Sequence, residues 1–154
     1  MSRTPRPAGP EDAAMLAALD AGADPHPWRT SQYERAVAGA AGQQVLILSV
    51  DNRPVGCVVL AVAAGQGSIH RIVVAGEQRR RGLGLSLLQA ALSAARAAGA
   101  THCLLEVRES NAAALALYEH AGFSLDGRRK GYYTQPDRSG GRADALLMSC
   151  SLED

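Results

Sequence analysis

Short apolar runs separated by turn residues dominate the middle of the chain. The segments Gln44 to Val50, Val55 to Val62 and Ile69 to Val74 are largely apolar and rich in β-branched side chains. The stretches between them, 51–54 and 65–67, contain the Asp, Asn, Pro and Gly residues typical of tight turns. This pattern predicts three antiparallel strands joined in succession.

A helical pattern follows the third strand. The apolar residues of this segment share one face of a helix: Leu87, Leu88, Ala91, Leu92 and Ala95. Gly99 stands where a left-handed C-terminal cap belongs. The next apolar run, Thr101 to Arg108, is expected to be a strand. A strand–helix–strand connection of this length predicts that the new strand runs parallel to its predecessor.

The first forty residues predict two helices before any of these strands. Residues 2–9 are rich in Pro and Arg and are expected to be extended. Pro10-Glu11-Asp12 opens a helix that Gly22 ends. Its shared apolar face is expected to consist of Met15, Ala18 and Leu19. Ser31 and Glu34 have the spacing of a capping box, which predicts a second helix lasting to about residue 39.

The C-terminal part predicts one more helix and two more strands. Ser110 or Asn111 caps a short Ala-rich helix that Gly122 ends. A strand starts at Phe123, and after a loop over residues 136–142 the last strand covers 145–151. The whole order predicts an α+β fold in a single domain, residues 1–154, with a mixed central sheet flanked by helices. The sheet is expected to be mostly antiparallel, with one central parallel pair.

Composition narrows the function classes. The chain has 154 residues, 47% of them hydrophobic, and a formal charge of only +1, which gives no general reason to expect nucleic-acid binding. Its three cysteines are far apart, and its four histidines have no ligand spacing with them, so no metal site is predicted. No apolar run reaches the length needed to cross a membrane, and the start lacks the apolar core of a signal peptide. These features predict a reduced, cytoplasmic protein.

A glycine loop lies between the third strand and its helix. It reads Arg79-Arg80-Arg81-Gly82-Leu83-Gly84, and the N–H groups of the first helical turn after it would attract an anion such as pyrophosphate. A P-loop is excluded because Leu85 and Ser86 follow the last glycine. A dinucleotide fingerprint is disfavoured because Leu87 stands where a small residue is required. The remaining form, Q/R-x-x-G-x-G/A, resembles the acetyl-CoA pyrophosphate loop of GNAT-family N-acetyltransferases. The plain alternative is a basic helix start without a ligand.

Two further residues are candidates for chemistry. Glu106 lies in the otherwise apolar strand Leu104-Leu105-Glu106-Val107. It could form an ion pair with a nearby Arg, or partial burial could raise its pKa and make it a base. Tyr118 lies seven residues after Asn111 on the same helix face. It could be a core residue or could line a bound ligand.

The resemblance becomes closer in the C-terminal half. The runs LEVRESNAAALALYEHAGF, RKGYY and ADALLM resemble the RimI-type ribosomal-protein-alanine N-acetyltransferases from about Ile69 onward. The resemblance implies the GNAT fold, with Glu106 as proton acceptor and Tyr118 as proton donor. It further implies that acetyl-CoA is bound by these residues: Ile72, Val73, Val74, Arg79, Arg80, Arg81, Gly82, Leu83, Gly84, Leu85 and Asn111.

The same resemblance implies the acceptor. It is expected to be a protein N-terminal α-amine, in particular the N-terminal alanine of a small-subunit ribosomal protein, held by Trp28, Tyr33, Tyr132 and Tyr133. Acetyl-CoA is expected as the co-substrate, without a metal. Three alternatives stay open: the same fold acting on a small-molecule amine or a lysine side chain, a non-catalytic acetyl-CoA sensor, and a basic module for RNA. The presence of both Glu106 and Tyr118 counts against a sensor, and the near-neutral charge counts against an RNA module.

Overall fold

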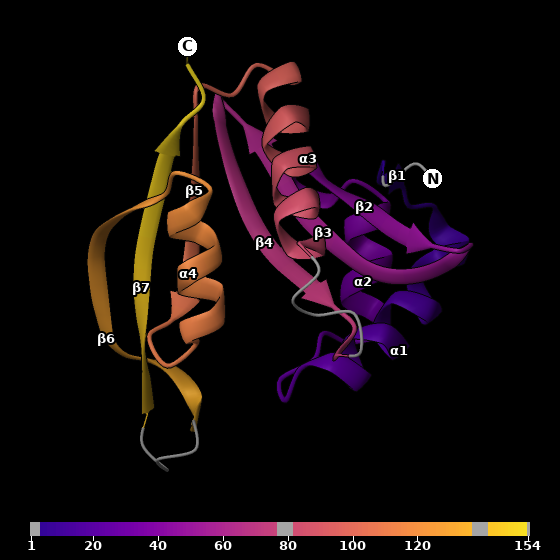
Figure 1. Cartoon of the computed structure of the whole chain (residues 1–154), viewed down its shortest axis with the longest axis horizontal. Coiled ribbons are helices and arrows are strands. Elements are labelled where there is room, and N and C mark those ends of the chain that lie inside the picture. The colour runs from indigo at the N-terminus through magenta and orange to yellow at the C-terminus, as the bar shows by residue number, and fades with distance from the viewer. Residues whose placement is uncertain (1–3, 77–81, 137–141, 154) are drawn as a thin grey trace.

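The computed structural model describes residues 4–76, 82–136 and 142–153 and contains a seven-stranded sheet (Figure 1). The strands, in the order β1-β2-β3-β4-β5-β7-β6, are β1 (Arg6–Pro7), β2 (Gln43–Val50), β3 (Arg53–Ala63), β4 (Gln66–Val74), β5 (His102–Arg108), β7 (Arg142–Ser151) and β6 (Ser124–Pro136). The helices are α1 (Ala13–Ala23), α2 (Thr30–Val37), α3 (Leu83–Ala97) and α4 (Ala112–His120). Short 3₁₀ turns cover Pro10–Asp12 and Ala40–Gly42. β4 and β5 are parallel and the other neighbouring strands are antiparallel, which confirms the predicted mixed α+β sheet.

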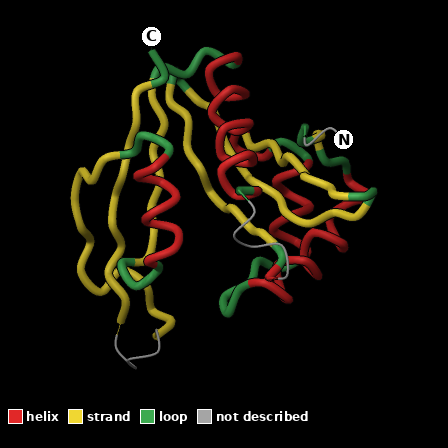
Figure 2. The backbone as a smooth tube through the Cα atoms, in the orientation of Figure 1, coloured by secondary structure: helices red, strands yellow, loops and turns green. Residues whose placement is uncertain are grey.

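Helices cover both faces of the sheet, as the tube view shows (Figure 2), and an apolar cluster lies on each face. α1 and α2 pack on one face of β2, β3 and β4, around the buried Leu16, Tyr33 and Ile47. α3 and α4 pack on the other face, around Leu87, Leu88 and neighbouring apolar residues. Successive residues of β2 and β3 point to opposite faces of the sheet and enter different clusters. Both strands are therefore apolar over most of their length.

The predicted hairpins are confirmed. Asp51 and Asn52 connect β2 to β3 with φ angles of 52° and 63°, and Ala64 and Gly65 connect β3 to β4 with φ angles of 52° and 77°. Two consecutive residues with positive φ are the mark of the hairpin turn whose twist suits the flanking strands. Both turns therefore set the register of the three strands before the functional region.

The N-terminal predictions need three corrections. A short strand, β1, precedes the helices and pairs with β2. The fully buried residues of α1 are Ala13, Leu16 and Asp20; of the predicted face, Met15 and Leu19 are partly buried against the same cluster and Ala18 is exposed. The helix also continues past Gly22 to Ala23. The periodicity analysis missed the fully buried residues because one of them is an aspartate.

The cap of α2 also differs from the prediction. The backbone N–H of Arg29 donates to Oε1 of Gln32 at 2.9 Å, so the cap lies two residues before the predicted Ser31. Ser31 and Glu34 are exposed residues within the helix. The helix ends at Val37, close to the expected position.

The parallel strands β4 and β5 pair over only part of their length. The pairing joins Gln66–Ile69 to His102–Leu105 and stops there. The register of β3 against β4 shifts at the next residue, His70, which is the extra residue of a β-bulge. Because a bulge bends its strand, β4 turns away from β5 beyond this point, and Figure 1 shows the two strands diverging. The part of the sheet beyond Ile69 and Leu105 is called the divergence below.

Close contact between α3 and β3 depends on Gly56. A Cβ added there would stand 2.7 Å from the Val73 carbonyl oxygen and 2.9 Å from Leu87 Cδ1. Gly56→Ala should lower the free energy of unfolding by about 1–3 kcal/mol, the usual cost of overpacking a filled core.

The matched control is Gly22 in α1, where an added Cβ meets nothing within 4 Å. Gly22→Ala should raise the free energy of unfolding by about 0.5–1 kcal/mol, because alanine is the better helix former. Urea denaturation of both variants measures the difference. Equal effects of the two substitutions would contradict the packing argument.

Candidate active site

The divergence leaves backbone groups of β4 directed away from β3. The N–H of Ala75 donates to the Val55 carbonyl at 2.8 Å, and Gly56 stands opposite Val74 in the register. In an antiparallel ladder the bonding direction alternates, so the N–H of Val73 points towards β3 while those of Ile72 and Val74 point towards the side that β5 has left. These are two of the three strand residues that the sequence predicted for acetyl-CoA.

The start of α3 lies near the end of β4. Gly82 has a left-handed φ of 74° and accepts the first intrahelical hydrogen bond, from the Ser86 N–H at 3.1 Å. The N–H groups of Leu83, Gly84 and Leu85 precede that bond and have no intrahelical acceptor. The other predicted members of this loop, Arg79, Arg80 and Arg81, lie outside the described residues.

Gly84 also brings α3 close to α4. A Cβ added to Gly84 would stand 3.3 Å from Leu117 Cδ2 and 3.9 Å from Val74 Cγ2. A small residue at this position therefore lets the first turn of α3 approach both the end of β4 and the helix that carries Tyr118.

α4 carries two predicted site residues, Asn111 at its N-terminal cap and Tyr118 within the helix. Asn111 caps the helix, with its Oδ1 accepting from the Ala114 N–H at 3.2 Å. Tyr118 is 6% exposed, and its ring meets Phe123 edge to face at a centroid distance of 5.9 Å. Burial raises the pKa of Tyr118 to about 12. Its hydroxyl therefore stays protonated, and remains a hydrogen-bond donor, at neutral and mildly alkaline pH.

Glu106 is exposed on β5. Its side chain is 37% exposed, and Oε1 lies 3.5 Å from Nη1 of Arg129. Of the two environments that the sequence left open for Glu106, the structure contains the ion pair with a nearby Arg. The physical reason is tertiary: α1 and α2 pack on β2 to β4, so this face of β5 receives no comparable cover from them.

Arg129, the partner of Glu106, belongs to a set of arginine–tyrosine contacts. Arg108 Cζ lies 4.2 Å from the ring centroid of Tyr133, and Arg129 Cζ lies 5.2 Å from that of Tyr132. The two rings meet edge to face at 5.3 Å. Contacts between cations and aromatic faces of this kind hold both partners in place.

The backbone bends just before these tyrosines. Gly131 has a φ of 57°, and its N–H donates to Asp144 Oδ1 at 2.8 Å. The register of β6 against β7 shifts between Arg129 and Tyr133. The bend therefore allows neighbouring tyrosines to pack against each other, which a regular strand would prevent.

Electrostatic coupling connects residues of four different elements. Besides its burial, the pKa of Tyr118 is lowered by the charge of Arg71 and raised by Tyr133. The pKa of Tyr133 is raised by burial and then by the Glu106 carboxylate. Tyr133 thus interacts with both residues: it raises the pKa of Tyr118, the predicted proton donor on α4, and its own pKa is raised by Glu106, the predicted proton acceptor on β5.

The residues predicted for the acceptor lie in two places. Tyr132 is exposed at the bend of β6, whereas Trp28 is half-buried in the segment between α1 and α2. Tyr33 is completely buried behind Trp28, with a ring-centroid distance of 5.3 Å. A direct contact of Tyr33 with an acceptor would therefore require it to leave the core.

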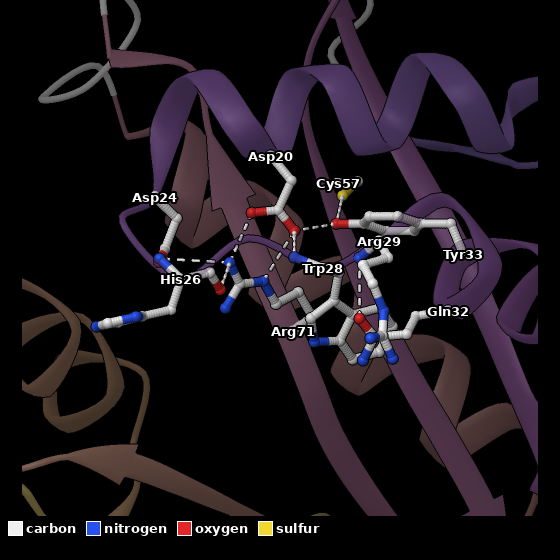
Figure 3. Close-up of polar contacts among 9 residues, drawn as sticks. All are labelled: Asp20, Asp24, His26, Trp28, Arg29, Gln32, Tyr33, Cys57 and Arg71. Atoms are coloured by element: carbon white, nitrogen blue, oxygen red, sulfur yellow. Dashed lines mark hydrogen bonds and ion pairs between the residues drawn. The ribbon is translucent and has the colours of Figure 1, made fainter. Parts of the chain in front are cut away.

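Tyr33 belongs to a buried polar cluster around Asp20 that the sequence analysis missed (Figure 3). Asp20 is 0% exposed, and its Oδ2 accepts from the Tyr33 hydroxyl at 2.7 Å and from the Trp28 N–H at 3.1 Å. The Tyr33 hydroxyl also lies 3.7 Å from Cys57 Sγ. Burial is the main cause that raises the pKa of the Cys57 thiol, to about 11.

Arg71 of β4 completes the cluster. Its Nη2 donates to Asp20 Oδ1 at 2.6 Å and its Nε donates to Oδ2 at 3.1 Å. Burial lowers the pKa of Arg71, but the hydrogen bonds and charge of Asp20 outweigh this and the pKa is raised. A sequence signal did exist, because Asp20 and Arg71 are both charged residues inside apolar segments, as Glu106 is.

The described residues contain neither a metal-binding cluster nor a helix that could span a membrane. Among them, no group of three or more His, Cys, Asp or Glu side chains could hold a metal ion. No helix in the described part of the chain is long and apolar enough to cross a membrane.

Comparison with known proteins gives consistent results. Residues 13–123 match the model of the Acetyltransferase (GNAT) family. The ribosomal protein bS18-alanine N-acetyltransferase of Salmonella typhimurium (strain LT2) is 33% identical over 128 residues, which cover 82% of each chain. The crystal structure of the ribosomal-protein-S18-alanine N-acetyltransferase from Escherichia coli is similar with a TM-score of 0.87 at 27% identity, covering 98% of this chain and 94% of that one. The structure of nourseothricin acetyltransferase is similar with a TM-score of 0.77 at 25% identity, covering 97% and 98%.

The buried cluster generates a test of stability. Tyr33→Phe removes a hydroxyl that donates to a fully buried carboxylate, so it should lower the free energy of unfolding by about 1.5–3 kcal/mol. Tyr132→Phe is the matched control, because this ring is 45% exposed and surface changes typically cost less than about 0.5 kcal/mol. Urea denaturation measures both. If Tyr33→Phe costs no more than Tyr132→Phe, the Tyr33 hydroxyl does not stabilise Asp20.

Proposed function

The chain belongs to the GNAT family of acetyltransferases, and from this premise we propose that it transfers an acetyl group from acetyl-CoA to the α-amine at a protein N-terminus. The acceptor proposed in particular is the N-terminal alanine of a small-subunit ribosomal protein. The observation that carries the reaction is the divergence of β4 and β5, with Tyr118 on α4 and Glu106 on β5 beside it. The similarity to two alanine N-acetyltransferases of ribosomal proteins supports the acceptor.

Acetyl-CoA is proposed to bind between β4 and the start of α3. The N–H groups of Leu83, Gly84 and Leu85 face outward from a helix N-terminus, which suits the pyrophosphate, and residues 79–81 would add positive charge. The backbone of Ile72 to Val74 is proposed to hold the pantetheine arm. Asn111 supports the same arm from α4 only in part, because its Oδ1 already caps the helix.

Glu106 is proposed as the proton acceptor. An α-ammonium has a pKa near 8 and must lose a proton before it attacks the thioester. The carboxylate of Glu106 is exposed enough to take this proton directly or through a water molecule. An acceptor ammonium carries the same charge as the Arg129 guanidinium that lies beside Glu106, so the two are expected to compete for it.

Tyr118 is proposed as the proton donor. It is buried and protonated, and its hydroxyl would give a proton to the sulfur of CoA as the thiolate leaves. The N–H groups of Ile72 or Val74 would stabilise the negative charge that develops on the carbonyl oxygen. The reaction needs no covalent enzyme intermediate. Cys103 is buried, and its pKa is raised to about 12, chiefly by burial, which suits a core residue.

The acceptor is proposed to lie between Trp28 and the tyrosines of β6. Tyr132 and Tyr133 are held by Arg129 and Arg108, so they offer a fixed wall with hydroxyl groups for the acceptor backbone. Tyr33 is proposed to support Trp28 from behind instead of touching the acceptor. Since the proposed acceptor is a ribosomal protein, the reaction is proposed to take place in the cytoplasm.

A small-molecule amine is the second candidate acceptor. The observation in its favour is the similarity to nourseothricin acetyltransferase over nearly the whole chain. The two candidates differ in what they need from the site. A peptide needs a groove with backbone partners, whereas a small amine needs only a compact pocket.

The proposed acid and base can be tested together. Glu106→Gln and Tyr118→Phe should each lower turnover at saturating substrates by on the order of a hundredfold or more, with acetyl-CoA affinity unchanged. Glu109→Gln is the matched control, because Glu109 is an exposed neighbouring carboxylate paired with Arg128. Free-thiol detection measures turnover and calorimetry measures affinity. Unchanged turnover in both variants would mean that the acid and base are other residues.

The acceptor class is tested with matched peptides. A peptide with a free N-terminal Ala should be acetylated at least about tenfold more efficiently than one with a blocked N-terminus and an internal Lys, because the groove is proposed to bind main chain next to a short α-amine. Tyr132→Ala and Tyr133→Ala should raise the KM for the first peptide. Preference for the blocked peptide, or for a free polyamine over both, would assign the enzyme to the alternative class.

A further inference from the structure

We propose that Arg71 is a positioning residue that holds the segment 24–28 in place and thereby sets the affinity for the acceptor, without contributing to acetyl-CoA affinity. The part that concerns the acceptor rests on the proposed function. The part that concerns the segment rests on contacts within this chain alone. Figure 3 shows these contacts, from α1, the segment, α2 and β4.

The Arg71 guanidinium contacts the end of α1 and two points of the segment that follows it. It makes two hydrogen bonds to Asp20 in the last turns of α1. The Arg71 Nη2 atom also lies 3.3 Å from Asp24 Oδ2 and donates to the His26 carbonyl oxygen at 3.3 Å. A planar guanidinium can satisfy acceptors in several fixed directions at once, which a lysine ammonium on its flexible stem cannot reproduce.

The segment depends on these carboxylates for its own hydrogen bonds. Pro25 and Pro27 have no N–H, so the only backbone donors of residues 25–28 are those of His26 and Trp28. The His26 N–H donates to Asp24 Oδ1 at 2.8 Å. The Trp28 N–H donates to Asp20 Oδ2 at 3.1 Å. Both donors therefore end on carboxylates that Arg71 neutralises.

The location of Arg71 connects the segment to the divergence. Arg71 follows His70, the bulge residue at which β4 leaves β5, and its side chain is only 16% exposed. The segment that it holds ends in Trp28, which is proposed as one wall of the acceptor site. The position of this wall relative to β4 is thus fixed by one side chain of β4.

A second way for Arg71 to act must be separated from the first. Its positive charge also acts on Tyr118, the proposed proton donor. If Arg71 acts through its charge, Arg71→Gln should lower turnover, and Arg71→Lys, which keeps the charge, should restore it. An effect through position would change the KM of the acceptor and would not be restored by lysine.

Trp28 provides a readout that needs no substrate, because it is the only tryptophan of the chain. In Arg71→Lys and Arg71→Gln, the emission of Trp28 should shift to longer wavelength, and acrylamide should quench it more strongly than in the parent protein. Arg6→Gln is the matched control. Arg6 forms a comparable two-bond pair with Asp12, at 3.1 Å for each bond, beside the start of α1 and away from Trp28.

The kinetic experiment uses the peptide with a free N-terminal Ala. Arg71→Lys and Arg71→Gln should raise the acceptor KM by about tenfold, change kcat by less than about threefold and leave the calorimetric affinity for acetyl-CoA unchanged. Arg6→Gln should match the parent protein in all three measurements. If the parent protein acetylates a different amine, the proposed function fails, and the same KM and kcat are measured with that amine.

Three results would overturn the inference. They are an unchanged Trp28 signal, an unchanged acceptor KM, and a fall in kcat that Arg71→Lys restores. If the Arg71 variants do not fold, Asp24→Asn gives the answer, because it keeps an oxygen for the His26 N–H and removes only the ion pair with Arg71. It should change the Trp28 signal and raise the acceptor KM in the same direction, and parental values for both would equally overturn the inference.

Discussion

The buried ion pair of Asp20 and Arg71 is the interaction on which the acceptor half of the structure depends. A carboxylate without exposure to water is tolerated only when it is fully paired, and removing one partner of such a pair typically costs about 3–5 kcal/mol. Asp20 meets this condition through donors from Arg71, Tyr33 and Trp28. The pair therefore fixes α1, α2 and the segment between them against β4, and the same β4 carries the backbone proposed for acetyl-CoA.

The bulge at His70 links this cluster to the reaction. Before the bulge, β4 pairs with β5; beyond it, the strands separate and the N–H groups of Ile72 and Val74 point towards the side from which β5 has diverged. The next residue after the bulge is Arg71. Its side chain donates to Asp20 of α1, on the face of the sheet opposite α3. The bulge at His70 thus opens the sheet for acetyl-CoA, the proposed co-substrate, and it precedes the side chain that holds the segment 24–28 proposed to bind the acceptor.

Local patterns predicted the parts of the fold that local physics determines. The hairpin turns, the face of α3 and the parallel β4–β5 pair follow from turn residues, helical spacing and a crossover connection, and all three are present. The most buried part of the α1 face was not predicted, because Asp20 enters the core only when Arg71, 51 residues later, is beside it. The choice between an ion pair and partial burial for Glu106 stayed open for a related reason, since an apolar strand sequence does not reveal which helices cover each end of the strand. Long-range pairing, and not propensity, decided both.

The exposure of Glu106 has a consequence for the proposed chemistry. A buried carboxylate gains basicity by losing water, but Glu106 keeps contact with water and lies 3.5 Å from an arginine. Its suitability as a base then depends on what replaces Arg129 when an acceptor is bound. Arg129 also contacts Tyr132, so an ammonium that displaces the guanidinium from Glu106 would leave it stacked on the tyrosine. In this arrangement the Arg129 guanidinium keeps the ring of Tyr132 as a partner. The Glu106 carboxylate then faces the acceptor ammonium, which can give up a proton, in place of the guanidinium, which cannot.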